Sequence, residues 1–216
     1  MRTPTRTSRS LIGRSGGLTH HLLVAALAVG LVVAGSSAAQ AQSITDADAA
    51  GDMSRYGYEN GETHPAPNQV RNDVLRTTVN HGATRISMRV RYVELRRLGE
   101  GHSQYLQMVT NEGIRRGLDV VGQPGDWAGS AVIWRERGEE NNIRCAIRHS
   151  IDYKANVISA SFPRRCAGNP RWVKFRVVSQ RMGETGVYRD DALRDQPFLG
   201  KTPAQSRRVY RASIGS

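Results

Sequence analysis

Apolar and polar residues alternate at every second position along much of the chain. The clearest run covers residues 85–92, where isoleucine, methionine, valine and tyrosine alternate with arginine and serine. Comparable runs lie at residues 75–79, 104–110, 117–121, 131–134, 143–153, 158–162 and 173–177. A period of two is typical of strands with one buried and one solvated face.

Clusters of glycine, asparagine, aspartate and proline separate these runs, and no convincing amphipathic helix interrupts them. About eight short strands at near-regular spacing predict an all-β fold, a two-sheet antiparallel β-sandwich. An open barrel is the alternative.

The runs on either side of residues 155–156 predict a hairpin closed by a disulfide. A tight turn there places Ile151 opposite Ala160 and Cys145 opposite Cys166, the two cysteines of the chain. No histidine or second cysteine lies at metal-ligand spacing beside either one, so we expect a structural bond. Its loop of roughly 20 residues would add about 3 kcal/mol of stability.

Residues 1–41 have the three-part composition of a cleavable secretory signal peptide. Arginines without acidic residues precede an apolar run at residues 22–33, and small residues follow, ending in Ala39-Gln40-Ala41. The apolar run of about 12 residues is shorter than the roughly 20 that span a bilayer. We therefore expect a secreted, extracellular protein without a membrane anchor after cleavage, a location that also favours a disulfide.

The remaining chain divides by composition into three parts. Residues 42–72 predict an acidic N-terminal loop segment, residues 73–196 the β-sandwich domain, and residues 197–216 a basic flexible tail.

The acidic segment contains the best candidate for a metal site. Asp46, Asp48 and Asp52 alternate with small residues, and a glycine before Asp52 permits a sharp turn. Calcium prefers such hard oxygen ligands, and Asp190 and Asp191 would complete the site if the chain ends meet. The sequence departs from an EF-hand loop, whose twelfth position requires glutamate but is glycine here. One Ca²⁺ is therefore a hypothesis, and a solvated acidic loop without any cofactor is the alternative.

The net charge of +12 includes four arginines of the expected leader. Arginines on the exposed parity of the predicted strands could form a basic face that binds phosphate or sulfate polymers; they are Arg85, Arg89, Arg91, Arg144, Arg148 and Arg176. Such residues also keep a sheet soluble and discourage edge pairing. No nucleic-acid-binding module is recognisable, and aromatic residues are not interleaved with these charges, so nucleic acid is not an expected partner.

Trp172 has the exposed parity of its strand and is a candidate to stack on a ligand, together with Arg144, Arg148 and Arg176. Packing of the ring beneath a loop is the alternative. No catalytic motif such as Gly-x-Ser-x-Gly or His-Glu-x-x-His is present. A catalytic site would need His149 to converge with Glu136, Glu139 or Glu140, and nothing in the spacing requires that.

The stretch from Pro163 to Val173, the upstream Cys145 and the acidic Gly51-Asp52 resemble a group of uncharacterised small secreted proteins of high-GC Gram-positive bacteria. This resemblance implies a β-sandwich and no particular chemistry. More distantly, the layout is similar to carbohydrate-binding sandwiches that carry a calcium ion near an N-terminal acidic segment, a likeness of architecture alone.

Together these features predict a secreted, non-catalytic binding or interaction protein that acts at or outside the cell surface. Cell-wall polymer, glycan or an extracellular protein are the candidate partners, and the oligomeric state is left open. The alternatives are a small basic secreted hydrolase such as a nuclease, and a protein-directed inhibitor or assembly subunit.

Overall fold

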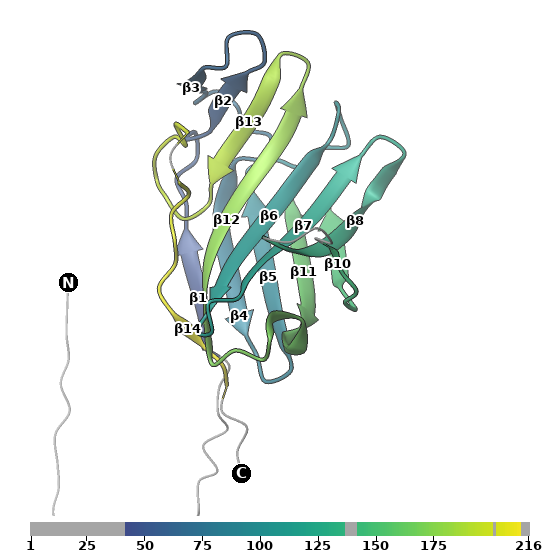
Figure 1. Cartoon of the computed structure of the whole chain (residues 1–216). Coiled ribbons are helices and arrows are strands. Elements are labelled where there is room, and N and C mark those ends of the chain that lie inside the picture. The colour runs from purple at the N-terminus through teal and green to yellow at the C-terminus, as the bar shows by residue number, and fades with distance from the viewer. Residues whose placement is uncertain (1–41, 137–141, 201, 213–216) are drawn as a thin grey trace, which may run out of the picture. The chain divides into compact units, whose positions relative to one another are not determined.

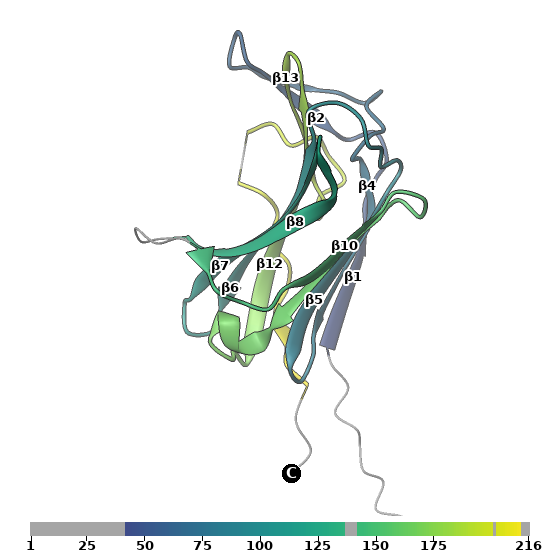
Figure 2. The same ribbon diagram turned by 90° about the vertical axis from the view of Figure 1, so that its right-hand side faces the viewer.

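The computed structural model describes residues 42–136, 142–200 and 202–212. They form two antiparallel sheets packed face to face, as Figures 1 and 2 show. One disulfide is present among them. The predicted all-β sandwich is therefore confirmed. The described residues contain fourteen strands rather than about eight. The additional strands are short or lie in the end segments, except β13 at residues 186–191, which the alternation did not predict. The expected signal peptide, residues 1–41, lies outside the described residues.

The first sheet has five strands in the order β1-β4-β5-β11-β10. Their bounds are β1 (Gln42–Ala47), β4 (Val74–His81), β5 (Arg85–Tyr92), β11 (Val157–Pro163) and β10 (Arg148–Asp152).

The second sheet has nine strands, eight of them in the order β3-β2-β13-β12-β6-β7-β8-β9. Their bounds are β3 (Thr63–Pro65), β2 (Ser54–Gly57), β13 (Gly186–Asp191), β12 (Trp172–Gly183), β6 (His102–Thr110), β7 (Arg115–Gln123), β8 (Asp126–Arg135) and β9 (Asn142–Ile143). The ninth strand, β14 (Val209–Tyr210), pairs with β12. One 3-10 turn, η1 (Arg164–Ala167), connects β11 to β12.

The core lies between the two sheets and follows the predicted alternation. In β5, Ile86, Met88 and Val90 are at most 2% exposed, whereas the serine and arginines that alternate with them are exposed or half-buried. In β12, Phe175 and Val177 are fully buried on the opposite layer. Burial of these apolar side chains supplies the main driving force for packing the two sheets together.

The β10–β11 hairpin has a different register from the predicted one. Ile151 lies opposite Ile158 rather than Ala160. The cause is the turn: Asp152 accepts hydrogen bonds from two turn amides, at 3.0 and 2.9 Å, and Asn156 adopts a positive φ of 54°. The resulting turn is longer than the predicted one and shifts the partner of every residue in β10.

The predicted disulfide between Cys145 and Cys166 is present, with their Cα atoms 6.3 Å apart. Neither residue belongs to the paired hairpin. Cys145 lies between β9 and β10, where the chain crosses from the nine-stranded to the five-stranded sheet, and Cys166 lies in η1, where it crosses back. The bond therefore joins two connections between the sheets instead of closing a ribbon.

Both end segments take part in the sandwich more than predicted. Residues 42–72, expected to be a loop segment, contribute β1, β2 and β3. Residues 202–212 of the expected tail run along the edge near β1, where β14 pairs with β12, Val209 is 1% exposed and the Tyr210 amide donates to Gln42 Oε1 at 3.0 Å. Residues 213–216 lie outside the described residues. Within the described ranges, no helix is long and apolar enough to cross a membrane.

Candidate metal centre

Three aspartates from distant parts of the chain converge at the β1/β13 edge of the sandwich. Asp48 follows β1, Asp52 precedes β2 and Asp190 belongs to β13. Each offers a carboxylate oxygen, these oxygens lie within 4.8 Å of one another, and all three residues are buried. The structure thus brings together two residues of the acidic N-terminal segment and one of the second acidic group.

The loop between β1 and β2 is shaped to bring its two aspartates inward. The Asp48 amide donates a hydrogen bond to the Leu75 carbonyl of β4 at 3.1 Å, which ties this residue to the five-stranded sheet. Gly51 has a φ of 85°, a left-handed conformation that glycine adopts without strain. Its amide donates to Asp73 Oδ2 at 2.8 Å, and the chain then continues into Asp52.

Asp190 is held by a backbone group of the opposite sheet. The Val74 amide, at the start of β4, donates to Asp190 Oδ2 at 2.6 Å. Because β4 belongs to the five-stranded sheet and β13 to the nine-stranded sheet, this bond fixes the second carboxylate oxygen, Oδ1, in the space between the sheets.

Several carboxylate oxygens at this edge are buried and accept no hydrogen bond from any described group. They are Asp48 Oδ2, both Oδ atoms of Asp52, Asp73 Oδ1, Asp190 Oδ1 and Asp191 Oδ1. Apart from Asp191, none of these residues forms an ion pair with a described basic side chain. A buried carboxylate without a partner for its negative charge is strongly unfavourable. These carboxylates must therefore either bind a cation or be protonated.

The raised pKa values of these aspartates reflect the same unfavourable burial of negative charge. Burial, reinforced by the carboxylates of Asp190 and Asp52, raises the pKa of Asp48 from 3.8 to about 9. Burial, with Asp73 nearby, raises the pKa of Asp52 to about 7. Burial likewise raises the pKa of Asp190 well above its ordinary value and that of Asp73 upward. At neutral pH the cluster therefore binds protons unless a cation takes their place.

The donor set selects the class of cation. All three converging ligands are carboxylates, and no histidine or cysteine belongs to the group. Oxygen donors suit hard cations, and calcium accepts six to eight of them at roughly 2.3–2.6 Å in irregular geometry. Magnesium usually keeps several waters and uses one or two carboxylates. Three protein carboxylates, two from the irregular loop between β1 and β2 and one from β13, therefore fit calcium better than magnesium.

Two of the predicted metal ligands lie outside this group. Asp46 is half-buried on β1, opposite Thr77 of β4. The Asp191 carboxylate accepts from the Ala204 amide at 2.6 Å and pairs with Arg194 at 3.3 Å.

One buried aspartate beside the group of three was not predicted. Asp73 is fully buried, and its charge raises the pKa of both Asp52 and Asp190. Its only signal in the sequence is its position directly before an alternating strand, which does not distinguish it from a turn residue.

The predicted ligand-binding residues do not form one site. Trp172 and Arg176 have the outward parity of β12 in the nine-stranded sheet, and the Arg208 guanidinium lies 4.7 Å from the Trp172 ring centroid. Arg148 is exposed on β10 of the five-stranded sheet, and Arg144 is exposed in the connection between β9 and β10.

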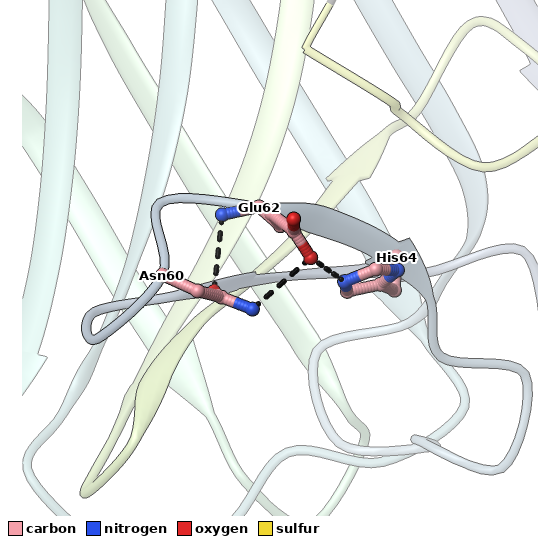
Figure 3. A network of polar contacts seen from close by, with 3 residues as sticks. All are labelled: Asn60, Glu62 and His64. Carbon is pink, nitrogen blue, oxygen red and sulfur yellow. Dashed lines mark hydrogen bonds and ion pairs between the residues drawn. The ribbon is translucent and has the colours of Figure 1, made fainter.

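A second polar network closes the turn between β2 and β3 (Figure 3). Glu62 Oε2 lies 3.0 Å from His64 Nε2 and accepts a hydrogen bond from Asn60 Nδ2 at 3.1 Å. The His64 and Glu62 side chains are 60% and 62% exposed. The network therefore orders a turn in water and does not form an enclosed acid–base site.

The residues considered for catalysis have other partners. His149 Nε2 lies 2.8 Å from the Gly129 carbonyl of β8, so this side chain connects the two sheets. Glu136 pairs with Arg115 at 3.2 Å. Glu139 and Glu140 lie outside the described residues.

Comparison with known proteins gives no match, whether with family models, curated proteins or solved structures.

Proposed function

We propose that this chain is a secreted, non-catalytic binding protein whose β-sandwich is completed by one Ca²⁺ ion. The observation that supports this proposal most strongly is the convergence of three buried carboxylates whose free oxygens lie within 4.8 Å of one another. A divalent cation at this point would neutralise charge that no described side chain neutralises.

The ion would also have a structural role. Asp48 leaves the five-stranded sheet, whereas Asp190 belongs to the nine-stranded sheet. A cation bound by both carboxylates would link the sheets where Asp48, the residue after β1, lies close to Asp190 of β13. Extracellular modules typically bind calcium with dissociation constants of about 10⁻⁴–10⁻³ M, which suits the secretion expected from residues 1–41.

The binding role rests on the surface of the sandwich. Exposed arginines lie on the outer face of β5, and the net charge of +12 stays positive without the four arginines of the expected leader. A rigid sheet that presents cationic side chains is suited to an anionic or hydroxyl-rich partner outside the cell, either a cell-wall polymer, a glycan or another protein.

Thermal unfolding of the mature protein tests the calcium. Compared with the same protein in chelator, calcium at about ten times its dissociation constant should add roughly 1.4 kcal/mol, which raises the midpoint by about 3–6 °C. Magnesium at the same concentration should raise it less. An unchanged thermal midpoint in calcium at millimolar concentration would contradict the proposed calcium site.

Retention on natural material tests the binding role. The calcium-loaded protein is passed over isolated cell walls and, separately, over immobilised proteins of a culture filtrate, with the heat-denatured protein as control. We expect saturable retention by one of the two. If neither retains the folded protein more than the denatured one, a binding function outside the cell is contradicted.

A further inference from the structure

We infer that the outer face of the five-stranded sheet binds a phosphodiester-linked polymer of sugars or polyols. This inference rests on the proposed binding function and names its ligand class and surface. The surface is a shallow groove of about 450 Å³ that runs over β4, β5, β11 and β10, the layer on the right in Figure 2.

Two neighbouring rows of small polar side chains line this groove. Strand pairing places Asn80, Ser87, Ser161 and Arg148 side by side in the first row. The second row contains Thr78, Arg89, Ser159 and Ser150. On the two central strands, β5 and β11, three of the four positions in these rows are serine, and the short serine side chains leave the surface hollow between Arg89 and Arg148.

Two arginines of the groove have no partner among the described residues. The guanidinium groups of Arg89 and Arg148 make no hydrogen bond or ion pair with any described group, and both residues are exposed. A third arginine already has partners at the end of the groove, because Arg85 donates to Ser161 Oγ at 3.1 Å and to the Ser161 carbonyl at 2.7 Å.

The charge of the groove is of one sign. Its lining residues include two arginines and one histidine but no aspartate or glutamate. Burial and the nearby charges of Arg148 and Arg165 lower the pKa of Arg85, which indicates that positive charge accumulates at this end of the face. The face is therefore complementary to an anion.

The side chains that line the groove indicate which class of ligand it can bind. Guanidinium groups bind phosphate oxygens through paired hydrogen bonds, and serine, threonine and asparagine side chains can both donate to and accept from hydroxyl groups. Among the described residues that line the groove there is no phenylalanine, tyrosine or tryptophan, and the one histidine, His149, lies with its Nε2 2.8 Å from the Gly129 carbonyl of the other sheet. The groove therefore lacks the large aromatic surface on which proteins stack the bases of single-stranded nucleic acid. A sugar-phosphate or polyol-phosphate chain presents phosphate and hydroxyl groups but no nucleobases, and it therefore matches this lining.

Binding of defined polymers to the calcium-loaded mature protein tests this inference. The probes are poly(glycerol phosphate), neutral dextran and single-stranded RNA, each titrated at low and at physiological ionic strength. We expect poly(glycerol phosphate) to bind more tightly than the other two, with an affinity that falls as salt is added.

Two matched double variants locate the surface. Arg89→Gln with Arg148→Gln should weaken poly(glycerol phosphate) binding about tenfold or more for each arginine, the usual worth of a charge-assisted hydrogen bond. Arg96→Gln with Arg171→Gln removes the same charge from outside the groove and should reduce affinity less than about threefold. Ser87→Val fills the groove without changing charge and should also weaken binding.

Each other outcome overturns the inference. Equal binding of dextran, tighter binding of RNA, or equal losses in the two double variants would each exclude a phosphate-specific groove on this face. The proposed function can be tested separately from this inference. If the Arg89→Gln, Arg148→Gln variant is still retained on cell walls, the protein has a binding role, but another surface carries it.

Discussion

At the scale of single residues, Asp52 shows most directly what the folded chain lacks. Its side chain is buried, and neither carboxylate oxygen accepts a hydrogen bond from a described group. Each of its neighbours Asp48, Asp73 and Asp190 has one oxygen satisfied by a backbone amide and one oxygen free. The backbone thus orients each of these carboxylates and leaves one oxygen for a further ligand.

Asparagine substitutions test these residues one at a time. Asp52→Asn and Asp190→Asn should each abolish the rise of the thermal midpoint in calcium, because each removes a charged ligand. In chelator, Asp52→Asn should be at least as stable as the wild type, since the repulsion that its charge causes is gone. Asp46→Asn, outside the group of three, is the matched control and should respond to calcium normally. Wild-type responses in all three variants would contradict the site.

The pH dependence of the calcium-free protein has a definite sign. Because the pKa values of Asp48 and Asp52 are raised to about 9 and about 7 in the folded state, the folded state holds protons that the unfolded chain has released. The free energy of unfolding in chelator should therefore fall as pH rises from about 4 to about 9. Saturating calcium should reduce this fall, because the ion replaces the protons.

Urea unfolding at pH 5, 7 and 9, with calcium and with chelator, measures both effects. A calcium-free protein whose stability rises over this range would show that the carboxylates are solvated and ionised, contrary to their burial.

The sequence predicted part of the aspartate cluster. The spacing of Asp48 and Asp52 around Gly51 indicated a turn with oxygen ligands, and this turn is present. Asp73 was missed, because a lone aspartate before a strand has the same appearance as an ordinary turn residue. Asp46 lies outside the group of three, since β1 continues through Ala47 and spacing alone cannot show this.

At the scale of elements, alternation predicted the long strands well and one boundary poorly. Residues 143–153 look like a single strand, but the chain leaves β9 at Ile143, crosses to the other sheet and begins β10 at Arg148. Cys145 and Ile147 in the crossover still pack against the core. The inward pattern therefore continues through a segment without strand pairing, and no periodicity argument could have located the crossing.

The outer face of the nine-stranded sheet contains a close contact that can be tested. Trp134 of β8 lies opposite Gly117 of β7, and a Cβ atom at Gly117 would be 2.0 Å from the Trp134 ring. The indole Nε1 donates to Asp119 Oδ2 at 3.0 Å. Gly117→Ala should therefore displace the ring and cost about 1–3 kcal/mol.

A double-mutant cycle with Trp134→Leu identifies the cause. In the Trp134→Leu background, Gly117→Ala should cost clearly less, because no ring has to move. The change in tryptophan fluorescence on Gly117→Ala reports the displacement directly. An equal cost in both backgrounds would mean that backbone effects, and not the ring, explain the destabilisation.

At the scale of the whole molecule, the sandwich has a link between its sheets at each of two opposite edges. The aspartate cluster lies at the β1/β13 edge, and the Cys145–Cys166 bond lies at the edge formed by β9 and β10. In the five-stranded sheet, β1 and β10 are separated by four steps of about 4.8 Å, or roughly 19 Å. At this separation the two links should act independently.

Removal of the disulfide tests that independence. Cys145→Ser with Cys166→Ser should lower the free energy of unfolding by about 3 kcal/mol, the value for a loop of this length. The combination with Asp190→Asn should give the sum of the separate effects within about 0.5 kcal/mol, measured in calcium. A large coupling between the two changes would show that the edges unfold together through a shared structure.

The arrangement of the chain ends could not be predicted from local patterns. Strands β2, β3 and β14 have two to four residues each, too few for a period of two to be recognised. The segment with β14 is positioned by tertiary contacts instead, such as the Ser206 amide bonded to the Phe175 carbonyl at 2.8 Å. Composition correctly marked these segments as polar, but whether polar segments pack or stay free is decided by such partners.

Equilibrium dialysis against calcium measures the central claim most directly. The mature protein should bind one calcium ion per chain at about millimolar concentration, and a variant with both Asp52→Asn and Asp190→Asn should bind none. Binding of less than a tenth of an ion per chain by the folded wild type, or equal binding by the variant, would contradict a cation between the two sheets.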